Sequence, residues 1–182
     1  MNAKRIISLN ALKIESVNRT EKGAVISGYA CHFGTPNGNG EIVDEKSFEQ
    51  FFAQLKNSGL MPAFNFQHSD SRIIGGWDTI TADADGLHVV GHLNTASKYV
   101  ADDILPLVEA GDVTHLSTQG FSYFDDWEER EDGFYIKNFY LTAISLVALP
   151  ADFGAKAELR NDYRAWKECN LKKQPPKPII IY

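Results

Sequence analysis

Short runs of alternating apolar and polar residues, interrupted by turns rich in glycine and asparagine, dominate the chain. Alternation with a period of two is typical of strands that bury one face. The clearest turn lies at 83–86, where Asp-Ala-Asp-Gly separates two such runs and the glycine tolerates a positive φ angle. The pattern predicts strands over 5–14, 24–33, 62–67, 76–82, 86–94 and 113–123, a strand beginning at Ile73, an acidic loop over 125–132, and one or two strands within 134–149.

Two segments repeat their apolar residues with helical spacing. The first begins after Asp44, a good N-cap, and ends at the Asn-Ser-Gly of 57–59. The second begins after Thr95 or Ser97 and ends at Gly111. Both place their apolar side chains on one stripe, which is typical of a helix packed on a core. The stripe residues are Phe48, Phe51, Phe52 and Leu55 in the first helix, and Val100, Ile104, Leu107 and Val108 in the second.

About eight strands joined mostly by short turns, with two or three helices, favour an antiparallel α+β fold over a doubly wound one. A small β-barrel is one arrangement of such strands. At 182 residues and 20.3 kDa the chain suits one domain. We predict a domain over residues 1–160. Residues 161–182 would then hold the end of a last helix and a tail rich in proline and lysine.

Composition and charge narrow the class of protein. Hydrophobic residues make up 43% of the chain and charged residues 23%, which excludes global disorder. The 18 basic and 24 acidic residues leave a net charge of −6, so no basic field favours nucleic acid or an anionic membrane as partner. Cys31 and Cys169 are too few and too far apart for a disulfide scaffold, and no apolar run approaches the roughly 18 residues of a membrane span. We expect a soluble, intracellular protein.

His68 is the histidine best placed for chemistry, because it follows an apolar strand and has polar neighbours. A catalytic base needs such a position, and an imidazole satisfied by a turn carbonyl would also explain the residue. His88 and His92 lie four residues apart, on one face of a predicted strand. No third ligand has fitting spacing, so a polar sheet face explains them better than a metal site.

Ser117 is a candidate nucleophile on the predicted strand 113–123. It lies three residues before Gly120, and a glycine lets a substrate backbone approach closely. A serine in a strand is more often structural, and catalysis needs an imidazole within about 2.6–3.2 Å of the hydroxyl. His115 shares the face of Ser117 but points parallel to it, so it is a poor direct base.

Several common motifs are absent from the sequence: the P-loop, the dinucleotide fingerprint, HExxH and the G-x-S-x-G elbow. Nucleotide hydrolysis, zinc peptidase chemistry and the usual esterase fold therefore lack support. We expect neither a cofactor nor a metal.

Six short segments, in order and with fitting gaps, resemble the prohead proteases of tailed double-stranded DNA bacteriophages. None of the segments is specific by itself, but their joint order is, and the likeness spans roughly residues 24–158. The segments are Gly28-Tyr29-Ala30 with Phe33-Gly34, Gly40-Glu41-Ile42-Val43 with Ser47-Phe48, Phe66-Gln67-His68, Ser71-Arg72-Ile73-Ile74-Gly75, Glu109-Ala110-Gly111-Asp112 with Leu116-Ser117, and Ile144-Ser145-Leu146-Val147-Ala148-Leu149-Pro150-Ala151.

This resemblance implies the fold of the herpesvirus assemblins, which are serine peptidases with a small, mostly antiparallel β-barrel surrounded by helices. It implies that His68 is the catalytic base and Ser117 the nucleophile. By the general logic of serine peptidases, His68 would take the Ser117 proton during attack on the scissile carbonyl and pass it to the leaving amine. Backbone amides within 118–120 are candidates for the oxyanion hole.

Two positions depart from the family pattern. Family members usually have one residue between the serine and Gly-Phe, whereas Thr118 and Gln119 stand there in this sequence. Many also carry an acidic or imidazole side chain just before the Ser-Leu-Val segment to orient the catalytic histidine, where this sequence has Thr142 and Ala143. A dyad assisted by water or by Thr142, a substitute such as Asp70, and loss of activity all stay open.

The resemblance implies a serine endopeptidase that cleaves scaffold protein, or the scaffold segment of the major capsid protein, and itself during procapsid maturation. Such an enzyme would act inside the phage procapsid, in the cytoplasm of the bacterial host, and would self-associate as assemblin-like enzymes often do. One alternative is a catalytically decayed protease-fold protein that serves as an assembly or scaffolding factor, as Ala143 suggests. A β-rich binder of small molecules is a weaker alternative.

Overall fold

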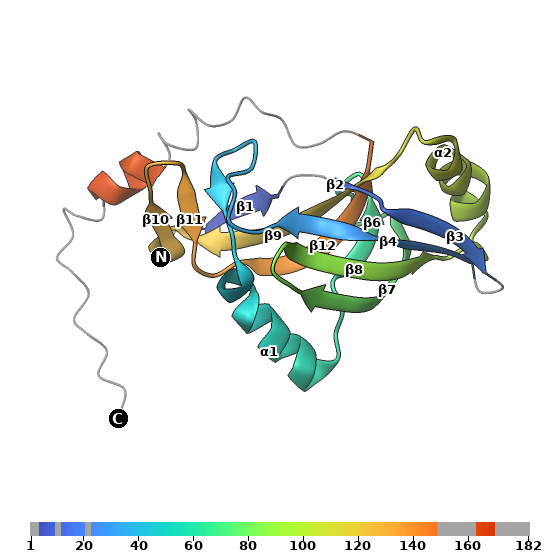
Figure 1. Ribbon diagram of the computed structural model, residues 1–182, viewed down its shortest axis with the longest axis horizontal. Helices are drawn as coiled ribbons and strands as arrows, with labels where there is room; N and C mark the ends of the chain where they lie inside the picture. Colours follow the sequence, from blue (N-terminus) through green and yellow to red (C-terminus); the bar gives the residue numbers. More distant parts are fainter. Residues whose placement is uncertain (1–3, 10–11, 21–22, 149–162, 170–182) are drawn as a thin grey trace.

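The computed structural model describes residues 4–9, 12–20, 23–148 and 163–169 (Figure 1). Its strands are β1 (Lys4–Ser8), β2 (Leu12–Lys13), β3 (Ser16–Thr20), β4 (Gly23–His32), β5 (Glu41–Ile42), β6 (Ala63–Phe66), β7 (Ile73–Ala82), β8 (Gly86–Leu93), β9 (His115–Tyr123), β10 (Trp127–Glu129), β11 (Phe134–Ile136) and β12 (Tyr140–Val147). Its helices are η1 (Glu45–Phe48), α1 (Glu49–Ser58), η2 (Tyr99–Ile104), α2 (Leu105–Ala110) and η3 (Phe124–Asp126). Residues 163–169 are also helical. None of the described helices has both the length and the apolar character of a membrane span.

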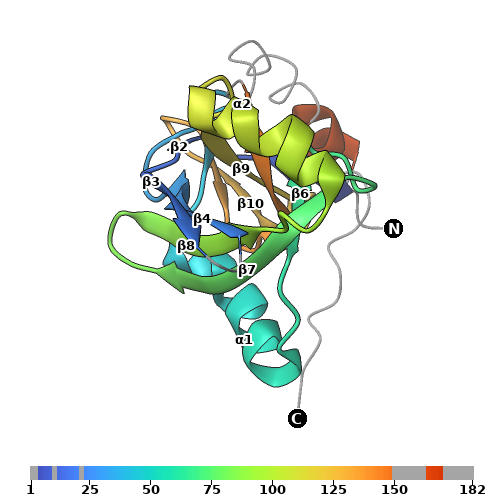
Figure 2. The same ribbon diagram turned by 90° about the vertical axis from the view of Figure 1, so that its right-hand side faces the viewer.

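Most of the strands form one large sheet. Its hydrogen-bonded order is β1-β9-β12-β6-β7-β8-β4-β3, and β2 also pairs with β9. The pairs are antiparallel except β12 with β6, which run parallel. Strands β10, β11 and β5 form a second, smaller sheet. Figure 2 shows α1 and α2 on opposite sides of the strands. The predicted α+β class is therefore confirmed.

The predicted small barrel is not confirmed. The order of the described strands has two ends, β1 and β3, and these two strands do not pair with each other. The segment 12–20 contacts both halves of the sheet, because β2 pairs with β9 and β3 pairs with β4. A barrel needs continuous strand pairing around its circumference. The described strands form an open order instead.

The first helix begins and ends where the sequence predicts. Asp44 Oδ1 accepts a hydrogen bond from the Ser47 amide at 3.1 Å, and Ser47 Oγ accepts one from the Asp44 amide at 3.0 Å. This reciprocal pair is a capping box. The helix ends at Gly59, whose φ angle of 68° is easily adopted by glycine. Phe48 and Phe51 are buried, so the predicted stripe does face the core.

The second helix ends at Gly111 as predicted, where the φ angle is 81°. Its start differs from the prediction, because it begins as a π-helix at Tyr99 and no side chain caps it. The backbone carbonyl of Ser97 accepts a hydrogen bond from the Val100 amide at 3.0 Å, so Ser97 contributes through its backbone rather than its hydroxyl.

The predicted loop over 125–132 contains strand β10, so this prediction is wrong in part. Trp127 is the reason, because its side chain is 4% exposed and packs against the rings of Phe134 and Tyr163. Tyr163 fixes the helical residues 163–169 to the same cluster. The division of the chain at residue 160 stays a prediction, since much of 149–182 lies outside the described residues.

Candidate active site

Three neighbouring strands at the centre of the large sheet carry polar side chains in one row. Ser117 on β9 is the register partner of Ser145 on β12, and Ser145 is the partner of Asn65 on β6. Directly opposite residues point to the same face, with Cβ atoms about 4.5–5.5 Å apart. All three are buried, with exposed fractions of 1%, 0% and 0%. The sheet therefore brings together residues from three distant parts of the chain.

A tight turn after β6 holds His68 next to this row. Gln67 and His68 have φ angles of 54° and 55°, in the left-handed region that side chains other than glycine seldom adopt. The Ser69 amide closes the turn on the Phe66 carbonyl at 3.1 Å. The Gln67 amide donates to the Leu146 carbonyl at 3.0 Å, which ties the turn to β12. Such strain costs about 1–3 kcal/mol per residue and often marks a functional site.

The His68 imidazole joins the polar row through Ser145. Its Nδ1 atom lies 3.0 Å from Ser145 Oγ. Ser145 Oγ in turn donates a hydrogen bond to Asn65 Oδ1 at 2.6 Å. The observed partner of the imidazole is thus a hydroxyl that is itself fixed by a buried amide.

Burial lowers the pKa of His68, and the Gln119 side chain beside it partly opposes this effect. The charged imidazolium loses hydration when it is half-buried, so the neutral form is favoured. Gln119 lies two residues beyond Ser117 on β9, so both side chains point to the face that His68 covers. A neutral imidazole over the Ser117 face of the sheet is competent to act as a general base at neutral pH.

Ser117 makes its hydrogen bond to a backbone carbonyl and not to His68. Its Oγ donates to the Leu9 carbonyl at 2.8 Å, and the Leu9 amide donates to the Thr118 carbonyl at 3.2 Å. Ser117 and His68 thus both flank Ser145, one as its strand partner and the other as its hydrogen-bond partner. In the described contacts they do not bond to each other, and the assignment of Ser117 and His68 as nucleophile and base stays a prediction.

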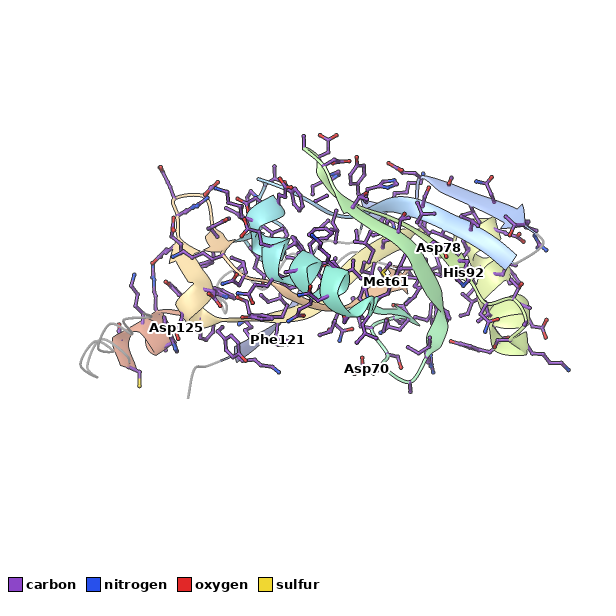
Figure 3. All side chains as sticks on the ribbon, turned by 90° about the horizontal axis from the view of Figure 1, so that it is seen from below. Met61, Asp70, Asp78, His92, Phe121 and Asp125 are labelled. Carbon is purple, nitrogen blue, oxygen red and sulfur yellow. The ribbon has the colours of Figure 1, made fainter. Side chains whose placement is uncertain are left out.

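The residues expected to replace an acidic orienting group do not contact His68. Thr142 Oγ1 donates to the Gln119 carbonyl at 3.1 Å. Asp70 is exposed on the loop between β6 and β7 (Figure 3), and the described contacts include no bond from it to His68. Ala143 is buried between Gln119 and Ala63 in the sheet.

Sequence reasoning missed Ser145 as the partner of His68. The two residues meet because β6 and β12, far apart in sequence, pair in parallel. The one available signal was the position of Ser145 within the Ile-Ser-Leu-Val segment that resembles the protease family.

The extra residue between Ser117 and Gly120 does not distort β9. This strand pairs with β1 in continuous register from Gln119 to Tyr123. The irregularity lies in the neighbouring strand, where Thr142 is bulged between Leu141 and Ala143. The proposed oxyanion-hole amides of 118–120 lie within β9, and their role stays a prediction.

The other four histidines lie in other surroundings. His32 Nδ1 is 3.1 Å from the Asp85 carbonyl oxygen. His88 Nε2 is 3.2 Å from Glu15 Oε2, and His92 Nδ1 is 3.0 Å from Asp78 Oδ1 (Figure 3). His115 Nδ1 lies 3.1 Å from the hydroxyl of the preceding threonine. No group of metal-ligating side chains that could hold an ion occurs within the described residues.

Comparisons with known proteins identify the family of this chain. The prohead protease of Enterobacteria phage HK97 is 31% identical over 134 residues, which cover 72% of this chain and 57% of that protein. The chain therefore spans less than two thirds of that relative. The structure of the bacteriophage T4 capsid assembly protease is similar in fold, with a TM-score of 0.68 at 10% identity over 80% of this chain and 98% of the other. The family model of the caudovirus prohead serine proteases matches residues 10–168, so the chain belongs to that family.

Proposed function

We propose that the chain is a serine endopeptidase that cleaves scaffold protein, or the scaffold segment of the major capsid protein, during procapsid maturation. The observation that carries this proposal is the half-buried His68 imidazole, held by a strained turn and by its contact with Ser145 over the Ser117 face of the sheet, in a chain of this family. The printed names of the two similar proteins, a prohead protease and a capsid assembly protease, support the same role.

In this proposal Ser117 is the nucleophile and His68 the base. Ser117 Oγ attacks the scissile carbonyl carbon while its proton passes to His68, and the tetrahedral intermediate collapses to an acyl-enzyme as His68 gives that proton to the leaving amine. A water molecule that gives its proton to His68 then attacks the acyl-enzyme, and His68 returns the proton to Ser117 Oγ as the acid product leaves. The hydroxyl must first turn away from the Leu9 carbonyl, to which it donates in the described arrangement. Amides within 118–120 would stabilise the oxyanion.

The proposed place of action is the interior of the procapsid, in the cytoplasm of the bacterial host. Enclosure raises the effective concentration of the substrates, so a slow enzyme can still complete the cleavage. Capsid protein, scaffold protein and the protease itself are the proposed substrates. Self-association, as in assemblin-like enzymes, is part of this proposal.

Two observations favour the alternative of a decayed protease that acts as an assembly factor. The Ser117 hydroxyl is committed to the Leu9 carbonyl, and Ala143 cannot orient an imidazole. In this alternative the fold would be kept for contacts with capsid or scaffold protein, without cleavage.

Co-expression with the cognate capsid and scaffold proteins separates the two functions. We compare the wild-type chain with Ser117→Ala and with a matched control, Ser122→Ala, which removes another buried hydroxyl from β9. Intact mass should reveal defined fragments with the wild type and the control, and none with Ser117→Ala. Thermal unfolding of the purified variants verifies that each is folded. Uncut capsid protein in every sample, with normal shells, would establish the assembly factor instead.

A further inference from the structure

The contacts around His68 fix where its proton lies. Ser145 has one hydroxyl proton, and it is donated to Asn65 Oδ1 at 2.6 Å. At the 3.0 Å contact with His68 Nδ1, Ser145 Oγ is therefore an acceptor, and Nδ1 must carry the proton. A neutral imidazole with a proton on Nδ1 has an unprotonated Nε2, which is the atom that can accept a proton.

We propose that Ser145 and Asn65 are the positioning residues of the site, which hold His68 in the tautomer with Nδ1 protonated and so take the place of an acidic orienting residue. The activity part of this inference rests on the proposed function. The tautomer itself is a property of the folded chain and can be measured without a substrate.

Burial supports a positioning role over a packing role. Asn65 and Ser145 are both completely buried, and the Asn65 amide nitrogen has no hydrogen-bond partner among the described residues. A buried polar atom without a partner destabilises a fold, so apolar side chains would suit these two positions better if packing alone mattered. The Asn65 amide oxygen orients the Ser145 hydroxyl, and this hydroxyl can orient the imidazole. Asn65 lies on β6 and Ser145 on β12, and the pairing of these strands fixes both positions.

The pair differs from a carboxylate in having no charge. A carboxylate both orients a catalytic histidine and stabilises the imidazolium that forms when it accepts a proton. Ser145 and Asn65 can do only the first. Gln119 on β9 is also neutral, and Asp70 and Arg72 on the loop of His68 are exposed. The site should therefore run as a slow catalyst whose base is active down to mildly acidic pH.

The tautomer is tested by ¹⁵N NMR of the histidine side chains in the full-length, uniformly labelled chain at neutral pH. In the wild type we expect His68 with Nδ1 protonated and Nε2 unprotonated. Ser145→Ala should abolish this preference, whereas Ser145→Thr, which keeps the hydroxyl, should retain it. Ser122→Ala is the control and should leave the His68 signals unchanged. A wild-type His68 protonated on Nε2, or an unchanged tautomer in Ser145→Ala, would overturn the inference.

Cleavage of the capsid or scaffold protein provides the second readout. Ser145→Ala should lower kcat by at least about tenfold, because the base spends less time in the productive tautomer, and Ser145→Thr should recover most of it. Asn65→Asp brings a carboxylate to the pair and should move the acidic limb of the pH–rate profile to higher pH. Equal cleavage by the wild type and Ser145→Ala would also overturn the inference. A wild-type chain that shows the expected tautomer but no cleavage would overturn the proposed function while the orienting role stands.

Discussion

Two parts of the large sheet use histidine in different ways. Around β9, β12 and β6, His68 is half-buried in a strained turn, and Ser145 and Gln119, its hydrogen-bond partners among the described residues, are both neutral. Around β7 and β8, His88 and His92 both lie on β8 and contact the acidic side chains of Glu15 and Asp78. Figure 3 shows His92 and Asp78 together on one strand pair, apart from the loop that carries Asp70.

The difference separates the proposed catalytic region from an ordinary polar sheet face. Polar contacts of partly exposed side chains contribute about 0–1 kcal/mol, so the contacts of His88 with Glu15 and of His92 with Asp78 are consistent with a polar sheet face. The strained turn at His68 and the amide nitrogen of Asn65, which has no hydrogen-bond partner among the described residues, each cost stability. A role beyond folding would explain why the first region keeps these costly features.

The largest expected effect is on cleavage. His68→Ala removes the proposed base and should lower kcat by about 10²–10⁴-fold, whereas His92→Ala, on the exposed face, should leave it within about twofold. Both variants are assayed with the cognate scaffold protein as substrate, at equal enzyme concentration. Equal losses in the two variants would break the comparison, because the two regions would then be functionally alike.

Much of the fold follows from local signals. The alternating runs predict the strands that form most of the sheet, and Asp44 as an N-cap, with the Asn-Ser-Gly of 57–59, predicts the bounds of the first helix. Strand β10 escapes prediction because its acidic residues resemble a loop, and only Trp127 packs inward. Local patterns also carry no information on whether distant strand edges meet, so the open order of the sheet was not available from them.

The site could be predicted only in part, for the same reason. His68 and Ser117 stand out by their positions next to a strand end and a glycine, and by the family resemblance. Their shared neighbour Ser145 depends on the parallel pairing of β6 with β12, which no short motif reports. The bond from Ser117 to the Leu9 carbonyl likewise depends on a backbone atom 108 residues away.

Backbone strain in the turn at Gln67 and His68 predicts a second, smaller difference between the two regions. Gln67→Gly removes the side chain from a position with a φ angle of 54° and should raise the free energy of unfolding by up to about 1 kcal/mol. The matched change in the other region, Thr79→Gly on β7, should lower the free energy of unfolding by about 1 kcal/mol, because glycine loses more backbone freedom than threonine when it is held in an extended strand. Urea unfolding at neutral pH measures both. A loss of stability in Gln67→Gly as large as that in Thr79→Gly would show that the turn is not strained.

The smallest expected effect is the pH dependence that His68 adds to stability. Its folded-state pKa is lowered from 6.5 by burial, so the unfolded chain binds more protons in the interval between the two values. The free energy of unfolding should therefore fall as the pH drops through 6.5 toward the folded-state pKa, and His68→Gln should lack this contribution. Urea unfolding of both proteins at about pH 8 and about pH 5 isolates it, because the other titrating groups cancel in the difference between the two proteins. Ser122→Ala, which changes no titratable group, serves as the control. If the wild type keeps or gains stability relative to His68→Gln on acidification, burial does not lower the pKa of His68. The contrast between His68 and the histidines of β8 would then fail.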